Sequence, residues 1–212
     1  MLKINEIFFS IQGESTLAGL PTVFVRTSGC HLRCNYCDTK YAYVEGKNLS
    51  IAEIITEVKK YLSKHVCITG GEPLLQKNSL LLMKDLCTLG YNVSLETSGD
   101  ISCKDVDPRV RKIIDVKTPD SGEQNKFFLE NLNLPEVNCE FKFVICSEND
   151  FFWAEDFSKK YLLNEKYAVL YSPSFEKIEA RWLAEKILKN NSSARLQLQQ
   201  HKYIWSCNTR GV

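Results

Sequence analysis

Three cysteines stand close together in the chain, at a spacing that suits a metal centre. Cys30, Cys34 and Cys37 lie in the segment GCHLRCNYCDT with the spacing C-x3-C-x2-C, and the next cysteine is Cys67. Four thiolates fill every iron of a 4Fe-4S cluster, so three thiolates leave one iron open to an external ligand. An open position is typical of a catalytic metal centre rather than a structural one. The spacing therefore indicates a catalytic iron–sulfur site.

A zinc site of the Cys3His type is the alternative, with His31 or His65 as the fourth ligand. His31 directly follows Cys30 and is poorly placed to reach the metal that its neighbour binds. Zinc sites also usually take their ligands from two separated pairs. A zinc-stabilised binding module is therefore the competing function from a different class.

The remaining six of the nine cysteines are scattered, and we assign no role to them: Cys67, Cys87, Cys103, Cys139, Cys146 and Cys207. Cys67 and Cys146 fall in expected strands and Cys87 in an expected helix. A free cysteine in such a position commonly packs as a small hydrophobic side chain.

Charge and hydropathy restrict the function classes. Lys plus Arg number 27 and Asp plus Glu 26, so the net charge of +1 gives no electrostatic reason to expect nucleic-acid binding. No apolar run approaches the roughly 20 residues that cross a bilayer, and the N-terminus lacks the apolar centre of a signal peptide. We therefore expect a cytoplasmic protein with no membrane partner, in a compartment where disulfides are unlikely.

The pattern of secondary-structure elements that position these residues predicts an α/β protein. Short runs rich in Val, Ile, Phe and Tyr alternate with helical segments, as in parallel sheets. The expected strands are Lys3–Phe9, Thr22–Thr27, Val66–Thr69, Tyr91–Glu96, Lys112–Val116, Glu140–Cys146, Ala168–Tyr171 and Arg195–Leu198. This alternation predicts a mostly parallel sheet, open or curled into a barrel, with its sites at the carboxyl ends of the strands. No repeat or linker divides the chain, so we expect one domain over residues 1–212.

Four helices are expected between these strands. Ser50 and Glu53 form a capping box before a helix whose apolar face runs as far as Leu62. Gly90 follows a second helix at the position of a left-handed C-terminal cap. The expected helical segments after Ser50 are Ile51–Leu62, Asn78–Leu89, Glu148–Leu163 and Ser174–Lys189.

Two segments together make the chain resemble the radical S-adenosylmethionine (SAM) superfamily. The first is the C-x3-C-x2-C triplet with an aromatic residue, Tyr36, before its last cysteine. The second is Thr69-Gly70-Gly71-Glu72-Pro73, which follows the next strand and looks like the superfamily's GGE motif. Backbone without side chains can approach the amino-acid end of a cofactor closely. The resemblance implies a 4Fe-4S cluster on Cys30, Cys34 and Cys37, with SAM at its open iron.

The finer resemblance is to the 7-carboxy-7-deazaguanine synthase family, and it covers nearly the whole chain. Gln12-Gly13-Glu14, Arg26 and Cys37-Asp38-Thr39 carry it. It implies that Arg26 binds the substrate carboxylate, to which guanidinium makes two parallel hydrogen bonds. It also implies that the Thr39 hydroxyl binds Mg2+, a hard ion that prefers oxygen ligands. The implied substrate-binding residues are Ile11, Gln12, Gly13, Arg26 and Thr69.

The same resemblance implies a set of cofactor contacts and a reduced barrel. Glu96-Thr97-Ser98-Gly99 and Asp115-Val116-Lys117 end two strands and match family segments, and the tail Gln199–Trp205 matches a segment that brings the C-terminus near the substrate. The fold implied is a partial (β/α) barrel of mostly parallel strands with few helices. The implied SAM-binding residues are Tyr36, Cys37, Asp38, Gly71, Glu72, Ser98, Asp115, Val116, Lys117, Ser172, Pro173, Ser174 and Phe175.

The reaction implied by the resemblance is a radical ring contraction. An electron from the reduced cluster cleaves SAM, and the resulting radical abstracts hydrogen from 6-carboxy-5,6,7,8-tetrahydropterin. Rearrangement with loss of ammonia gives 7-carboxy-7-deazaguanine, a precursor in queuosine and 7-deazapurine biosynthesis. The resemblance also implies a flavodoxin- or ferredoxin-type electron donor and a homodimer.

A glycyl-radical-enzyme activating protein shares the cysteine triplet and is the closer competitor. It would act on a protein partner instead of a pterin. Gln12-Gly13-Glu14 together with Cys37-Asp38-Thr39 favours the pterin enzyme.

Overall fold

The computed structural model describes residues 1–206 and 209–212, so the expectation for Cys207 lies outside the described residues. Within them, one sheet of nine strands has the order β3-β1-β2-β4-β5-β6-β7-β8-β9. The bounds are β1 Leu2–Ile11, β2 Pro21–Thr27, β3 Lys47–Leu49, β4 His65–Gly70, β5 Asn92–Thr97, β6 Arg111–Asp115, β7 Cys139–Ile145, β8 Ala168–Pro173 and β9 Arg195–Leu196. Each of the eight expected strands is present, and β3 is the additional one.

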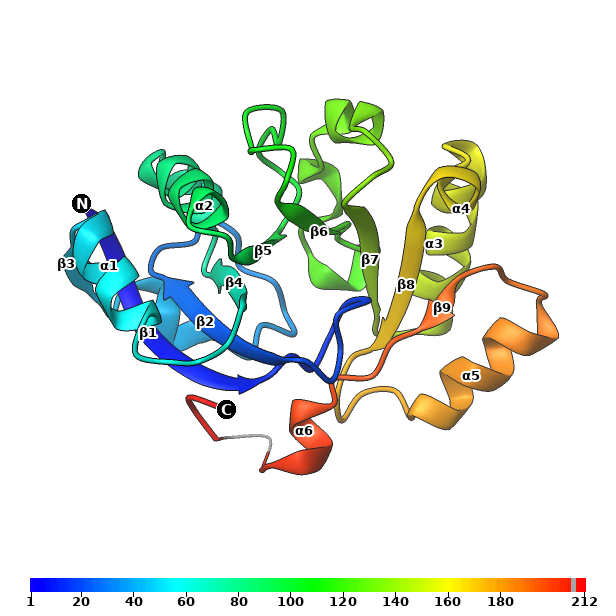
Figure 1. The fold of residues 1–212 in the computed structure, drawn as a ribbon. Helices are drawn as coiled ribbons and strands as arrows, with labels where there is room; N and C mark the ends of the chain where they lie inside the picture. The colour runs from blue at the N-terminus through cyan, green and yellow to red at the C-terminus, as the bar shows by residue number, and fades with distance from the viewer. Residues whose placement is uncertain (207–208) are drawn as a thin grey trace.

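The sheet is mostly parallel and open. All neighbours from β2 to β9 pair in parallel, whereas β1 is antiparallel to both β2 and β3. The loop between β1 and β2 is too short for the crossover that a parallel pair needs. The sheet curls (Figure 1), and its edge strands β3 and β9 do not pair with each other. The predicted partial barrel is therefore confirmed.

The helices are few, as expected. The α-helices are α1 Ile51–Val58, α2 Asn78–Thr88, α3 Glu148–Lys160, α4 Leu163–Lys166, α5 Ala180–Lys189 and α6 His201–Ile204. Short 3-10 turns are η1 Lys40–Tyr43, η2 Pro73–Leu75, η3 Pro119–Ser121, η4 Gln124–Lys126 and η5 Leu129–Asn133. Loops and 3-10 turns alone connect β5 to β6 and β6 to β7. The described helices include none long and apolar enough to cross a membrane.

The structure confirms two local predictions, the capping box at Ser50 and the left-handed cap at Gly90. The Ser50 side chain accepts a hydrogen bond from the Glu53 backbone, and the Glu53 carboxylate accepts one from the Ser50 backbone, so the capping box is formed. Gly90 has a φ of +84°, the left-handed conformation expected after α2. Both helix boundaries follow from short-range hydrogen bonding.

Several boundaries differ from the expectations. The helix after Ser50 ends at Val58, and Leu62 is fully exposed rather than on the buried face. The expected helix Glu148–Leu163 breaks at Leu162, whose backbone is left-handed, before α4 begins. The last helix starts at Ala180 rather than Ser174, because β8 continues to Pro173 and the Ser174 backbone still bonds to Ile145. Cys146 follows β7 instead of lying in it.

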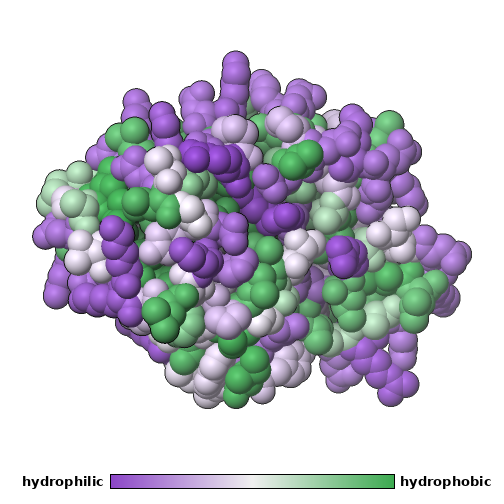
Figure 2. Space-filling view, viewed as in Figure 1, coloured by the Kyte–Doolittle hydropathy of each residue, from purple (hydrophilic) through white to green (hydrophobic). Residues whose placement is uncertain are grey.

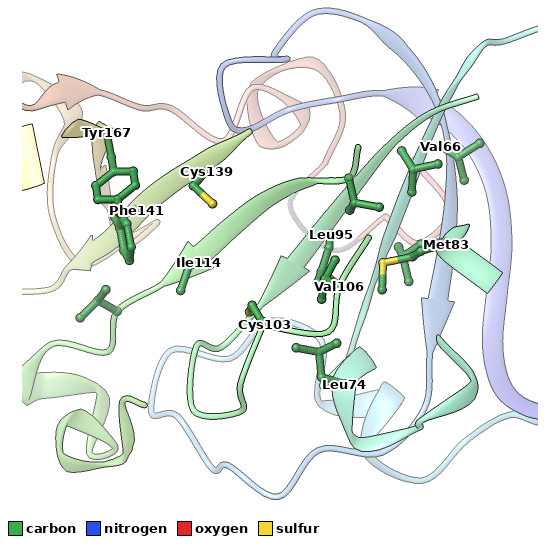
Figure 3. Close-up of a cluster of buried hydrophobic side chains, with 14 of the residues drawn as sticks. Val66, Leu74, Met83, Leu95, Cys103, Val106, Ile114, Cys139, Phe141 and Tyr167 are labelled. Atoms are coloured by element: carbon green, nitrogen blue, oxygen red, sulfur yellow. The ribbon is translucent and has the colours of Figure 1, made fainter. Parts of the chain in front are cut away.

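The two faces of the sheet differ in character. Val66, Leu95, Ile114 and Phe141 come from four neighbouring strands and are fully buried in the main core with Met83 of α2 (Figure 3). Helices α1 to α5 lie on the outer side of the curved sheet, whereas α6 contributes to the cavity (Figure 1). Figure 2 shows hydrophilic residues along the upper rim of this view, with apolar ones interspersed below. The hydrophobic core thus lies between the helices and the outer face of the sheet.

The inner face is polar where the outer face is apolar. Side chains alternate along a strand, so the residue after each core residue points inward. Thr69 follows Ile68, Asp115 follows Ile114 and Lys142 follows Phe141. The polar residues line a cavity, and the apolar residues that precede them pack in the core.

Candidate functional site

A cavity of about 700 Å3 occupies the inner face at the carboxyl ends of the parallel strands. The strand ends, the loop after β1, the loop that holds the three cysteines (residues 28–39, the cysteine loop) and the C-terminal segment all contribute to its wall. This is the edge at which α/β proteins bind their ligands. Segments far apart in the sequence therefore meet at one site.

The cysteine loop brings its three thiols to this cavity. Cys30, Cys34 and Cys37 all line it, and the Cys37 backbone N–H donates to the Cys34 carbonyl at 3.1 Å. Burial, partly offset by the Lys117 ammonium, raises the pKa of the Cys34 thiol to about 11. A metal that binds there must therefore displace the thiol proton. In the part of the chain that the structure describes, no three His, Cys, Asp or Glu side chains form a group that could hold a single metal ion.

Neither histidine of the zinc alternative completes a site with these thiols. His65 starts β4 and is in register with Thr22, whereas the cysteine loop follows the other end of β2, where Thr27 is in register with Gly70. The His31 ring contacts the Asp100 carboxylate instead. His65 thus lies at the amino ends of the parallel strands, whereas the cysteine loop lies at their carboxyl ends.

The glycine pair after β4 packs directly against the cysteine loop. Gly71 N–H donates to the Thr27 carbonyl at 3.0 Å, and Glu72 N–H donates to the Gly29 carbonyl at 2.8 Å. A Cβ at Gly71 would overlap the backbone carbonyl of Gly29. Glycine is therefore required where this turn meets the cysteine loop.

A second group of polar residues lies beside Arg26 in the same cavity. The Arg26 guanidinium pairs with Glu6 at 2.7 Å and lies 5.5 Å from the Phe8 ring centroid. Nearby, the Glu96 carboxylate accepts hydrogen bonds from the Thr69 hydroxyl at 2.8 Å and from the Gln12 amide at 3.3 Å. These groups offer both a cation and fixed polar atoms to a ligand.

A row of alternating charges connects the two halves of the cavity. The Lys142 ammonium lies 2.6 Å from Glu14 and 3.7 Å from Asp115, and Asp115 lies 3.0 Å from Lys117. The Gln199 amide donates to the other oxygen of Glu14 at 2.7 Å. Burial alone would raise the pKa of Glu14, but Lys142 and these hydrogen bonds hold it below its ordinary value. Lys142 was not identified as a site residue from the sequence.

Comparison with known proteins identifies the family. The model of the radical SAM superfamily matches residues 24–120. The 7-carboxy-7-deazaguanine synthase of Chlorobaculum tepidum is 44% identical over 215 residues, covering 100% of this chain and 97% of that protein. That of Koribacter versatilis is 40% identical over 226 residues and covers 100% of both chains. The chain belongs to the 7-carboxy-7-deazaguanine synthase family.

The fold agrees with this membership. The crystal structure of QueE from Escherichia coli matches with a TM-score of 0.77 and 22% identity, covering 93% of each chain. Membership of the radical SAM superfamily implies a 4Fe-4S cluster and SAM as cofactors. The structural match itself concerns the fold.

The cavity has the chemistry to accept these cofactors. The three thiols line it together, next to a backbone that only glycine allows. Two further atoms in its wall, Asp115 Oδ1 and the Tyr36 hydroxyl, are buried without a hydrogen-bond partner among the described residues. A buried polar atom left unpaired costs about 1–3 kcal/mol, so a polar ligand that pairs with them would be stabilised. The residues present therefore fit the cluster and SAM.

Asp38 and Thr39 follow the last cysteine and also line the cavity. The Thr39 hydroxyl donates to Asp38 Oδ1 at 2.9 Å, and the Lys202 ammonium of α6 lies 2.7 Å from Asp38. The Asp38 side chain is 47% exposed. Partial desolvation opposes its ionisation, but Lys202 and Thr39 lower its pKa to about 2. An anionic carboxylate thus stands beside the hydroxyl expected to bind Mg2+.

The structure places most of the residues implied by this family around the one cavity. Those that line it are Ile11, Gln12, Gly13, Arg26, Cys30, Cys34, Tyr36, Cys37, Asp38, Thr39, Thr69, Gly71, Ser98, Asp115, Lys117, Ser174 and Phe175. The implied residues not in its wall are Glu72, Val116, Ser172 and Pro173. Val116 is part of the core, and Ser172 and Pro173 are buried at the end of β8.

Glu72 binds the protein itself. It is fully buried, and its carboxylate accepts hydrogen bonds from Leu74 N–H at 2.9 Å, the Thr97 hydroxyl at 2.9 Å and Ser98 N–H at 2.7 Å. It therefore ties the glycine turn to the end of β5. Glu72 was expected to contact SAM, but in the structure its carboxylate contacts neighbouring protein groups.

Residues of the C-terminal segment also belong to the wall, as the family resemblance implied. Gln199, His201 and Lys202 line the cavity, and so do the described residues after the gap, Thr209, Arg210, Gly211 and Val212. Gln200 N–H donates to the Gly13 carbonyl at 3.0 Å. The C-terminal segment is thus attached to the loop after β1 that is expected to contact the substrate.

Proposed function

We propose that this chain converts 6-carboxy-5,6,7,8-tetrahydropterin to 7-carboxy-7-deazaguanine with loss of ammonia, the reaction for which its relatives are named. The observation that carries the proposal is the meeting of the three thiols, the glycine turn and Arg26 around one cavity. A radical ring contraction is chemistry that the cofactors supply. The protein then has to hold them, orient the substrate and exclude water.

The cavity supports a division of these tasks. Cys30, Cys34 and Cys37 would bind the cluster, and Gly71, Ser98, Asp115 and Lys117 would hold SAM beside it. When bound, the cluster and SAM supply the radical that starts the ring contraction.

On the other side, Arg26 would pair with the substrate carboxylate, because its fork geometry matches two carboxylate oxygens. The pairs with Glu6 and Phe8 keep the guanidinium in place. The C-terminal segment would cover the bound substrate and limit the access of water.

Anaerobic turnover tests this proposal. Reconstituted protein is mixed with the carboxytetrahydropterin, SAM and dithionite, and the product is identified by mass spectrometry. Formation of 7-carboxy-7-deazaguanine with 5′-deoxyadenosine supports it. A reconstituted protein that holds the cluster and cleaves SAM but leaves the pterin intact would favour the glycyl-radical activating function instead. Colourless protein without iron after reconstitution would favour the zinc module.

We also propose that Thr39 binds Mg2+ together with substrate oxygens. Thr39→Ala is expected to keep its full iron content while the stimulation of turnover by Mg2+ becomes several-fold weaker, because one oxygen ligand is lost. Turnover is measured against Mg2+ concentration, with Thr56→Ala on the exposed face of helix α1 as the matched control. An unchanged Mg2+ response in Thr39→Ala would place the ion elsewhere.

The remaining expectations extend the same proposal. A flavodoxin- or ferredoxin-type protein would reduce the cluster, and two copies of the chain would form a homodimer in the cytoplasm. Residues 1–212 would act as a single domain, which the continuous sheet supports.

A further inference from the structure

The loop after β1 (residues 12–20) crosses the inner face of the sheet to β7 (Figure 1). It contacts the inner face of that strand at two points. The Glu14 carboxylate pairs with the Lys142 ammonium, and Thr16 contacts the Glu140 carboxylate. Because the two contacts are two residues apart in both segments, the loop follows the inward-facing positions of β7. No task in the proposed function uses the second contact.

Glu140 is a buried carboxylate that binds the loop at both the backbone and the side chain of Thr16. It is fully buried, and it accepts hydrogen bonds from the Thr16 N–H at 3.0 Å and from the Thr16 hydroxyl. The Arg111 guanidinium of β6 donates to the same carboxylate at 3.0 Å and balances its charge. A buried charge is stable only when it is paired and hydrogen-bonded, and hydrogen bonds to a charged group are the stronger kind. Thr16 is therefore firmly attached to β7.

The backbone between the two contacts is held in an unfavourable conformation. Ser15 has a φ of +67°, in the left-handed region that costs free energy for a residue with a Cβ. Such a conformation persists only where the surrounding structure enforces it. Its neighbours Glu14 and Thr16 are both anchored to β7. Without the Thr16 contact, we expect the Ser15 backbone to relax and the loop to shift.

The course of this loop determines where Gln12 and Gly13 lie. The Glu14 N–H donates to the Gln12 side-chain carbonyl at 3.1 Å, and the Gln12 amide donates to Glu96 at 3.3 Å. The Gly13 carbonyl accepts the hydrogen bond from Gln200 that attaches the C-terminal segment. A shift of the loop backbone would therefore move the two residues that are expected to contact the pterin.

We propose that Glu140 and Thr16 are positioning residues, through which β7 holds the loop in the conformation that binds the pterin. The inference rests on the proposed function, because it takes Gln12 and Gly13 as substrate contacts. Neither Glu140 nor Thr16 lines the cavity, so both act through the loop. The glycine turn is held by backbone hydrogen bonds to the end of β2 and to the cysteine loop instead. Loss of the Thr16 contact should therefore weaken pterin binding and leave the cluster and SAM sites intact.

The test is the anaerobic steady-state kinetics of the reconstituted full-length protein. Thr16→Val removes the hydroxyl, keeps the branched shape of this exposed side chain and leaves the buried pair of Glu140 with Arg111 in place. We expect its KM for the carboxytetrahydropterin to rise about tenfold, because tenfold corresponds to about 1.4 kcal/mol, close to what one hydrogen bond to a charged group contributes. The kcat, the KM for SAM and the iron content should stay at the wild-type values.

Three further variants complete the test. Thr16→Ser keeps the hydroxyl and should restore the wild-type KM, and Thr56→Val on the exposed face of α1 should change none of these values. Glu140→Gln should raise the same KM, and adding Thr16→Val to it should raise the KM little further, because both substitutions act on one contact. If Glu140→Gln does not fold, the Thr16 variants decide the question alone.

Other outcomes overturn the inference. An unchanged pterin KM in Thr16→Val shows that the contact does not position the loop. An equal loss of SAM cleavage measured without pterin marks a general loss of structure, and a Thr16→Ser variant as impaired as Thr16→Val shows that the hydroxyl is not the group that acts. A wild-type protein that cleaves SAM but leaves the pterin intact instead refutes the proposed function, so the two failures are distinguishable.

Discussion

Replacing Cys34 by alanine is expected to abolish reductive cleavage of SAM. Cys34 is the most buried of the three thiols in the cysteine loop, and its loss leaves only two thiolates for the cluster. Two thiolates do not anchor a cluster that otherwise has one thiolate on each of three irons. 5′-Deoxyadenosine should fall to the level of a reaction without enzyme, and the iron content should fall with it.

The control for this variant is Cys87→Ala, in helix α2 and outside the cavity wall. It should keep the iron content and the cleavage activity of the wild type, because Cys87 is one of the cysteines that pack as small side chains. Full activity of Cys34→Ala would exclude the proposed cluster ligands.

Lys142→Met is expected to lower the free energy of unfolding by about 3–5 kcal/mol, the usual cost of removing one partner of a buried ion pair. The Lys142 and Glu14 side chains are 12% and 11% exposed, and Lys142 also lies near Asp115. Without the ammonium, Glu14 has no cation paired with it among the described residues and retains the hydrogen bond from Gln199, while Asp115 retains its pair with Lys117. Urea unfolding measures the difference.

The pH dependence of this difference provides a second check. In the wild type the pKa of Glu14 is lowered, so the stabilisation is present above the ordinary pKa of a carboxyl group and is lost as the pH falls. In Lys142→Met the burial of Glu14 is no longer offset by the ammonium, so its pKa should rise. Protonation of Glu14 in acid then removes the unpaired buried charge. The difference should therefore be largest at neutral pH and shrink in acid. Lys60→Met, which breaks an exposed pair with Glu57, should change little at either pH.

The parts of the site that follow a strand were predictable from the sequence. The cysteine loop follows β2 and the glycine turn follows β4, and β2 and β4 are parallel neighbours. Because parallel strands end at one edge, two motifs 30 or more residues apart had to meet. Family resemblance added Arg26 and the segment around Gln12, which contribute to the same cavity.

The ion-pair row was not predictable in the same way. Lys142 lies within Glu140–Cys146, where it reads as the polar residue of an alternating strand and carries no local motif. Its partner Glu14 lies 128 residues away, and Gln199 joins Glu14 across 185 residues. Only the curvature of the sheet brings these side chains together. Strand β3 was missed because its three residues, Lys47–Leu49, carry no β-type pattern.

The division of each strand into a core face and a cavity face has a consequence for how this enzyme tolerates variation. Ile114 and Asp115 are neighbours in the chain, yet one packs beneath the helices and the other lines the cavity. Substitutions at positions like Ile114 should accumulate a loss of thermal stability at constant turnover per folded molecule. Substitutions at positions like Asp115 should instead lower the turnover per folded molecule, with an added loss of stability where a buried ion pair is broken, as at Lys142. A mutational scan that scores abundance and turnover separately would therefore show losses of turnover with a period of two along β4, β5, β6 and β7.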